Sequence, residues 1–291
     1  MKKILLFIII LFLSVCFSAN PFNAEKEQNN DAEIKKGIAS YSTVALRNLS
    51  QMQLKLRNRI SRLTRKIKKE KSVKLIGTII LIAFFYGLIH AIGPGHGKTI
   101  TATYFLSRSS NIRTSILFAN ALTFMHSISA IFVVFTVNVI LRSTYSKSFA
   151  GIETISKKIS YILIILIGIY ILVKSILNLI NHKDRKEQAL REDLRTSLAI
   201  GLIPCPGTTI ILLFFMSLKL FWLGMLVILF LTLGMAVTLS VVGIVSILFR
   251  ERILNILEGT KFNIELTSHI LEIIGAAFII ILGTLLFLTV F

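Results

Sequence analysis

Two histidines flank a helix-breaking motif in a strongly apolar part of the chain. His90 and His96 lie on either side of a Gly-Pro-Gly break at residues 93–95, within an apolar run from residue 76 to residue 108. On an unbroken helix, a separation of six residues turns the two imidazoles about 240° apart. A break lets both rings face one cavity, where unwound carbonyls also favour a cation. Imidazole binds nickel, cobalt, zinc and copper ions well, so the pattern predicts a transient metal site.

Three further side chains could take part in this chemistry. His126 lies in the middle of the next apolar run, at a comparable depth. Lys98 follows the break and is interpreted either as a cap on half-helix carbonyls or as a transient partner of a transported ion. Cys205 lies at a second break, either as a small packed thiol or as an additional ligand that favours softer ions. A structural role stays open for each histidine, because membrane histidines also hydrogen-bond between helices.

The elements that position these residues are membrane helices. Of the 291 residues, 54% are hydrophobic and 16% charged, whereas a soluble domain carries about 25% charged residues. This composition excludes a soluble enzyme and a disordered chain. Six apolar runs reach the ~20 residues that a bilayer core requires. They are residues 76–108, 114–141, 158–180, 196–218, 221–249 and 267–290.

The two breaks belong to an internal repeat. Pro94–Ile100 matches Pro204–Ile210 as Pro-x-x-Gly-x-Thr-Ile, 110 residues apart, and Ser129 aligns with Thr238 at an offset of 109. An odd number of spans in each half places the halves in opposite orientations. The predicted fold class is an all-α polytopic membrane protein. Its six transmembrane helices form two inverted three-helix repeats, in which helices 1 and 4 are broken at proline.

The chain divides into four predicted segments. Residues 1–19 have the charged start, apolar run and small-residue ending of a signal peptide or signal anchor. Residues 20–75 form an extracytoplasmic region that contains a basic amphipathic helix. Residues 76–180 and 196–291 are the two transmembrane repeats.

The amphipathic helix combines an apolar face with a strong positive charge. Apolar residues recur in steps of three and four from Leu46 to Ile67. Between Arg47 and Lys74 the sequence contains eleven basic residues and a single acidic one. We interpret it as an interfacial helix on anionic lipid headgroups, with a coiled-coil or partner helix as the alternative. The net charge of +19 comes without a base-reading motif, so nucleic acid is not an expected partner.

The basic residues also predict an orientation. The turns at 108–113, 181–196 and 250–266 carry ten basic residues, and the opposite turns at 142–158 and 219 carry five. The positive-inside rule places the first set in the cytoplasm. The predicted location is the bacterial inner membrane, crossed several times.

Three segments together resemble a known family of transporters. Residues 86–98 read Tyr-Gly-Leu-Ile-His-Ala-Ile-Gly-Pro-Gly-His-Gly-Lys, residues 201–206 read Gly-Leu-Ile-Pro-Cys-Pro, and residues 233–238 read Leu-Gly-Met-Ala-Val-Thr. They resemble the signatures of the nickel/cobalt transporter family called NicO, over roughly residues 75–249. The resemblance implies efflux of nickel and cobalt ions, with His90 and His96 as the metal-handling pair and His126 where some members have a histidine. The long histidine-rich loop of the efflux members is absent.

Other functions fit the residues less well. A thiol–disulfide electron carrier on this plan needs a cysteine in each half, but Gly95 stands at the position that matches Cys205. Export of a small anion or an amino acid remains the alternative, because Lys98 could attract an anion. No phosphate-binding loop occurs in the sequence, so we expect no ATP hydrolysis and predict transport driven by an ion gradient, with protons as the coupling ion. We also predict that the protein is not an enzyme and holds no bound cofactor.

The predicted orientation can be tested with single cysteines at Ser40 and Gln188 on a Cys16→Ser/Cys205→Ser background. We expect a membrane-impermeant thiol reagent added outside to label position 40 and to spare position 188, because the signal segment exports residues 20–75. Labelling of position 188 but not position 40 would reverse the orientation.

Overall fold

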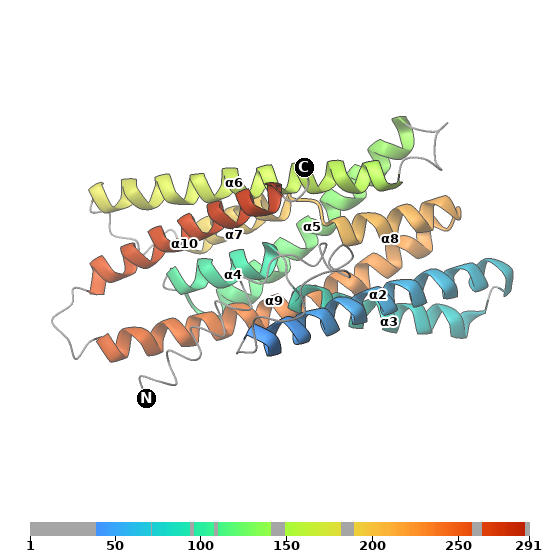
Figure 1. Cartoon of the computed structure of the whole chain (residues 1–291), viewed down its shortest axis with the longest axis horizontal. Helices are drawn as coiled ribbons and strands as arrows, with labels where there is room; N and C mark the ends of the chain where they lie inside the picture. Colours follow the sequence, from blue (N-terminus) through green and yellow to red (C-terminus); the bar gives the residue numbers. More distant parts are fainter. Residues whose placement is uncertain are drawn as a thin grey trace.

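The computed structural model describes residues 39–70, 72–93, 96–107, 110–140, 149–181, 189–257 and 264–288, and all regular structure in these residues is helical. The predicted signal segment at 1–19 lies outside them. The helices, labelled as in Figure 1, are α2 (Ala39–Glu70), α3 (Val73–Ile92), α4 (His96–Ser107), α5 (Ile112–Ile140), α6 (Phe149–Asn181), α7 (Ala189–Gly201), α8 (Pro206–Ser217), α9 (Phe221–Leu257) and α10 (Ile264–Leu288).

Two helix interruptions divide the bundle. One separates α3 from α4 over residues 93–95, and the other separates α7 from α8 over residues 202–205. Cys205 has an extended backbone and caps α8, whose first residue is Pro206. Proline suits this first position because its missing N–H would have no partner there. In Figure 1, α4 and α7 lie toward one end of the bundle, and α3 and α8 lie toward the other.

Several of the described helices are apolar enough for a membrane. Three are also long enough to cross it alone: Val73–Ile92, Ile112–Thr136 and Phe221–Ile253. Shorter apolar stretches run over Tyr161–Leu177, Gly207–Ser217 and Ile273–Leu285. All six coincide with parts of the predicted apolar runs.

Glycines bring the backbones of the central helices together. A Cβ atom at Gly87 of α3 would meet the Leu231 carbonyl of α9, and one at Gly234 of α9 would meet the Phe84 carbonyl of α3. Small residues allow this close approach in membranes, where helices associate through packing rather than through the hydrophobic effect. In the same way, Gly201 places α7 against α5.

Among the described residues, buried apolar side chains form three clusters, and the two larger ones lie on either side of the interruptions. The Tyr86 cluster joins α2, α3, α8 and α9 through Ile60, Ile67, Ile79, Ile82, Ala83, Tyr86, Ile211, Phe215, Val227, Leu231 and Met235. The Tyr104 cluster joins α4 to α7, α9 and α10 through Ile100, Tyr104, Phe105, Phe118, Ala119, Leu122, Tyr161, Ile164, Ile200, Ile203, Leu239, Ile247 and Ile279. Between them lies the region in which the predicted site residues fall.

Part of the apolar face of α2 is covered by protein. Ile60 is 1% exposed and Ile67 is 5% exposed, because both pack in the Tyr86 cluster. Figure 1 shows α2 running beside α3. The packing of Ile60 and Ile67 favours the alternative of a partner helix, whereas Met52 of the same face is 48% exposed, so the interpretation that the helix lies on anionic lipid stays a prediction. Periodicity identifies an apolar face but not what covers it.

The second interrupted helix starts earlier than predicted. Residues 189–195 were expected in a turn, but they form the first part of α7. Asp193 is only 1% exposed there and accepts a hydrogen bond from the Tyr104 hydroxyl of α4. The polar composition of this stretch concealed a helix that is held by a tertiary contact.

Two glycines of α3 provide a matched test of the α3–α9 contact. Gly87→Ala should destabilise the fold by about 1–3 kcal/mol, because the added methyl group overpacks a backbone contact. Gly77→Ala, at a site with nothing within 4 Å, should be neutral or stabilising by up to ~1 kcal/mol, since alanine favours helix. Thermal unfolding in detergent measures both. Equal melting temperatures for the two variants would contradict the close contact.

Candidate functional site

Cys205 lies at the centre of the candidate site. Its sulfur lies 3.2 Å from Nε2 of His90 on α3, and His126 of α5 is a second hydrogen-bonding partner of the same sulfur. The Cys205 thiol forms no capping hydrogen bond to α8. The Cys205 backbone carbonyl accepts hydrogen bonds from the Thr209 amide at 2.9 Å and from the Thr209 hydroxyl at 2.7 Å. The backbone around Cys205 is thus satisfied locally, and its side chain joins the two histidines.

The His90 ring is held by two neighbours. It stacks on Tyr86 one turn earlier, with ring centroids 5.5 Å apart and an interplanar angle of 24°. On its other side it meets Gly207, where a Cβ atom would lie 3.0 Å from Cε1 of His90. The second ring nitrogen, Nδ1, is buried and has no hydrogen-bond partner among the described residues. Buried polar atoms usually have a partner, so this nitrogen is available to a ligand.

Side chains from three elements satisfy the last carbonyls of α3. Thr238 of α9 donates to Leu88 O at 3.1 Å, Gln53 of α2 donates to Ile89 O at 3.1 Å, and Lys98 of α4 donates to Ile92 O at 2.9 Å. Lys98 therefore caps a half-helix, which is one of its two predicted roles. Three carbonyls near the end of α3 therefore already accept donors, while the expectation that the unwound carbonyls favour a cation stays a prediction, because residues 94 and 95 lie outside the described part.

A hydroxyl group of α5 also lies near the last carbonyl of α7. The hydroxyl of Ser129 on α5 donates to His126 O at 2.9 Å and lies 3.4 Å from Gly201 O. Ser129 and Thr238 are the pair that the internal repeat aligns. Thr238 lies on α9 and donates to a carbonyl near the end of α3. Ser129 lies on α5 and is within reach of a carbonyl at the end of α7.

The structure brings together only some of the predicted residues. His90, His126 and Cys205 meet, and Lys98 lies beside them at the start of α4. His96 is the first residue of α4, but its side chain lies outside the described part, so its pairing with His90 stays a prediction. Within the described residues, no group of three His, Cys, Asp or Glu side chains is arranged to hold a metal ion.

Two residues mattered more than the sequence indicated. The sequence predicts Cys205 only as a possible additional ligand, but its position at the matching break also indicates that it faces His90. The spacing of four between Tyr86 and His90 places both rings on one helix face.

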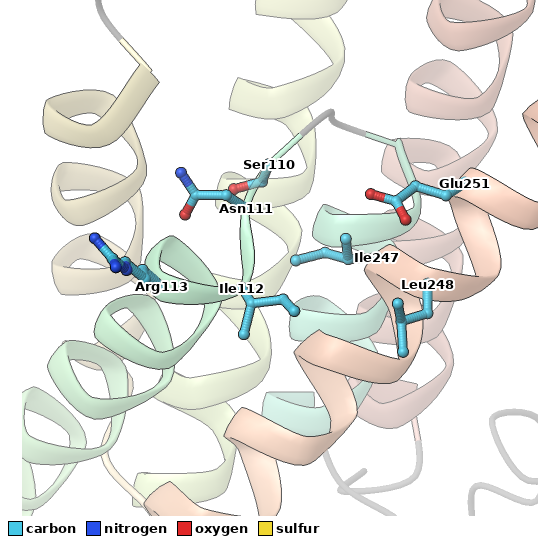
Figure 2. Close-up of a pocket in the computed structure, with 7 residues that line it drawn as sticks. All are labelled: Ser110, Asn111, Ile112, Arg113, Ile247, Leu248 and Glu251. Carbon is cyan, nitrogen blue, oxygen red and sulfur yellow. The ribbon is translucent and has the colours of Figure 1, made fainter.

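A separate pocket lies near the start of α5. It has a volume of about 510 Å³ and is lined by Ser110, Asn111, Ile112, Arg113, Ile247, Leu248 and Glu251. Figure 2 shows the Glu251 carboxylate turned toward the loop before α5, whereas the Arg113 side chain points away. This lining contains no histidine or cysteine, so it does not share the chemistry of the Cys205 site.

The described helices are long and apolar and enclose a small polar cluster, which defines a multi-pass membrane protein. In a bilayer, backbone groups must be hydrogen-bonded within the protein and polar side chains must have partners. Comparison with known proteins specifies the class further. Residues 76–198 match the NicO family, described as high-affinity nickel-transport protein, so the resemblance to this family is confirmed over α3 to α6 and most of α7. Cys205 follows the matched range.

Two relatives carry a name of the same kind. A Methanocaldococcus jannaschii protein named "Putative nickel/cobalt efflux system" is 25% identical over 206 residues, which cover 70% of this chain and 89% of that protein. A Haemophilus influenzae protein of that name is 30% identical over 102 residues, which cover 35% of this chain and 31% of that protein. No solved structure matches the chain.

Glycines at equivalent repeat positions test the packing around His90. We expect Gly207→Ala to displace the His90 ring, weaken its contact with Cys205 and accelerate alkylation of the buried thiol. Gly97→Ala is the matched control, because its nearest contact would be an ordinary 3.7 Å to Leu239. Alkylation by N-ethylmaleimide in detergent, followed by mass spectrometry, measures the rates. An unchanged rate in Gly207→Ala would show that Gly207 does not position the ring.

Proposed function

We propose that this protein exports nickel or cobalt ions across the bacterial inner membrane, driven by an ion gradient. The observation that carries the proposal is the coincidence of two findings. The NicO match covers the helices that bear His90 and His126, and these two imidazoles meet one thiol beside the helix interruptions. Ionisable groups inside membrane spans are costly and mark transport paths.

The proposed architecture is six spans in two inverted repeats. The first half is α3–α4, α5 and α6, and the second is α7–α8, α9 and α10. Reciprocal packing supports this arrangement, because α3 packs on α9 while α7 packs on α5. The paired donors Ser129 and Thr238 support it too, as does the mutual contact of α6 and α10 through Gly168 and Gly283.

The proposed ion site comprises His90, His126 and Cys205, with His96 as a further ligand from α4. In the present arrangement His90 and the thiol hydrogen-bond to each other. A divalent ion that binds both must displace the thiol proton, because thiolate and neutral imidazole are the metal-binding forms. Exchangeable ligands from separate helices suit a transporter, since a closed structural cage would retain the ion.

This exchange of a proton for a metal ion couples metal export to a proton gradient. The proton that leaves Cys205 when an ion binds returns when the ion departs, so metal and proton occupy the site in turn. The anion-export alternative receives less support, because the Lys98 ammonium that motivated it donates to a helix carbonyl.

Metal measurements in cells test the proposal. We expect His90→Ala and Cys205→Ser to lower nickel and cobalt export by about tenfold or more, since changing even a residue that only supports a metal ligand costs about 10–100-fold in affinity or activity. His126→Ala should reduce export less, because removing it leaves the His90–Cys205 contact in place. Thr136→Ala on α5 is the control, as its exposed hydroxyl bonds only within its helix.

Cellular metal content by mass spectrometry, normalised to the protein in the membrane, gives the comparison. A His90→Ala/His96→Ala double variant that exports nickel and cobalt at the wild-type rate would refute the proposed site. A wild-type protein that changes neither metal would refute the proposed function.

A further inference from the structure

The helix α2 precedes the residues that match the NicO family, which begin at residue 76, and the proposed function gives it no role. The residues of α2 that pack inward follow a heptad pattern, with alternating steps of three and four. Four of these residues are apolar and pack in or against the Tyr86 cluster, namely Leu56, Ile60, Leu63 and Ile67. The position one heptad before Ile60 is Gln53, so a polar side chain ends an apolar seam.

Gln53 is turned toward the interruption between α3 and α4. Apolar periodicity predicts that Met52 continues the buried face, but Met52 is 48% exposed and Gln53 is half-buried instead. The Gln53 amide donates to Ile89 O at 3.1 Å. The same carbonyl accepts the Gly93 amide at 3.0 Å, so Gln53 joins α2 to the hydrogen bond that ends α3.

The glycine at residue 93 makes room for the Gln53 amide. Its φ of −59° and ψ of 170° are values that any residue adopts, so the backbone itself does not require a glycine. A Cβ atom at this position would lie 2.3 Å from Nε2 of Gln53. Outside Gln53, its nearest contact would be an ordinary 3.4 Å to His90 O. The Gln53 amide therefore occupies the space that a side chain at residue 93 would need.

A polar residue in an apolar seam determines which residues of two helices meet. Apolar contacts alone allow α2 to shift by a turn, because α3 is apolar along most of its length. An amide that must reach one carbonyl permits a single register. Ile89 precedes His90 in the chain, and Tyr86, which stacks on His90, belongs to the cluster that α2 joins. The register of α2 therefore affects both the backbone and the stacking partner of His90.

We infer that Gln53 is a positioning residue for the Cys205 site and that α2 is part of the transport machinery. Through Ile89 O, Gln53 holds the end of α3 where Nε2 of His90 lies 3.2 Å from the Cys205 sulfur. Gln53 acts through the backbone of α3 and is not an ion ligand. The inference rests on the proposed function only for the ion that the positioned residues bind.

The variant Gln53→Leu separates positioning from packing. Leucine has a similar size and suits an apolar seam, but it cannot donate a hydrogen bond. We therefore expect α2 to stay packed while its register is no longer fixed. The matched control is Gln51→Leu, which is the same change at an exposed position of α2.

Three measurements test the inference on a Cys16→Ser background, in which Cys205 is the sole thiol. In detergent we expect N-ethylmaleimide to alkylate Cys205 about fivefold faster in Gln53→Leu, the effect of losing one ordinary hydrogen bond. In vesicles the nickel concentration for half-maximal transport should rise by a similar factor, while the maximum rate is retained. The melting temperature should not fall, because Ile89 O keeps the Gly93 amide. Gln51→Leu should change none of the three.

Gly93→Ala tests the same contact from the other side. Its methyl group displaces the Gln53 amide, so we expect the alkylation and transport changes of Gln53→Leu. In a Gln53→Ala background the shortened side chain no longer reaches residue 93, and adding Gly93→Ala should then have no further effect. Additive effects in the double variant would show that the two residues are independent, which overturns the inference.

The remaining outcomes are equally decisive. Unchanged alkylation and transport in Gln53→Leu overturn the inference. Faster alkylation with a lower melting temperature overturns it too, because it assigns Gln53 to packing alone. If Gln53→Leu does not accumulate in the membrane, Gln53→Met replaces it under the same criteria. A wild-type protein that transports neither nickel nor cobalt refutes the proposed function, while the alkylation rates still decide whether Gln53 positions His90 against Cys205.

Discussion

The structure depends on satisfying backbone carbonyls where a helix stops inside an apolar bundle. An unpaired carbonyl there costs several kcal/mol in a bilayer, where no water can replace the partner. The end of α3 meets this requirement with donors from Thr238, Gln53 and Lys98, which belong to three other helices. Because these side chains complete the backbone, the His90 ring and the Cys205 thiol need not cap a helix and can face each other.

This requirement also determines how closely the helices approach. A short threonine side chain reaches a carbonyl of a neighbouring helix only if the two backbones nearly touch, which explains the reciprocal glycines at Gly87 and Gly234. The same relation holds on the other side, where Ser129 lies within reach of the end of α7 because Gly201 lies against α5. Close packing and hydrogen bonding are therefore one feature of this fold rather than two.

Local patterns predicted the features that have local causes. The apolar runs and the amphipathic pattern of α2 can be read from composition and periodicity. The covering of α2 by α3 and α8, the role of Cys205 and the burial of Asp193 could not be read in this way. Each depends on a partner far away in the chain, such as Tyr104, 89 residues before Asp193. Polar residues at 189–195 looked like a turn because their partner was not visible.

The position of α2 has a consequence for the surrounding bilayer. Eight basic residues, namely Lys55, Arg57, Arg59, Arg62, Arg65, Lys66, Lys68 and Lys69, lie on the helix that runs beside the apolar α3, and all but Arg57 are exposed. Each would cost ~2.5–3.5 kcal/mol in the hydrocarbon core. Wherever the exposed face of α2 meets the bilayer, headgroups rather than acyl chains must therefore surround it, and anionic lipids suit its charge.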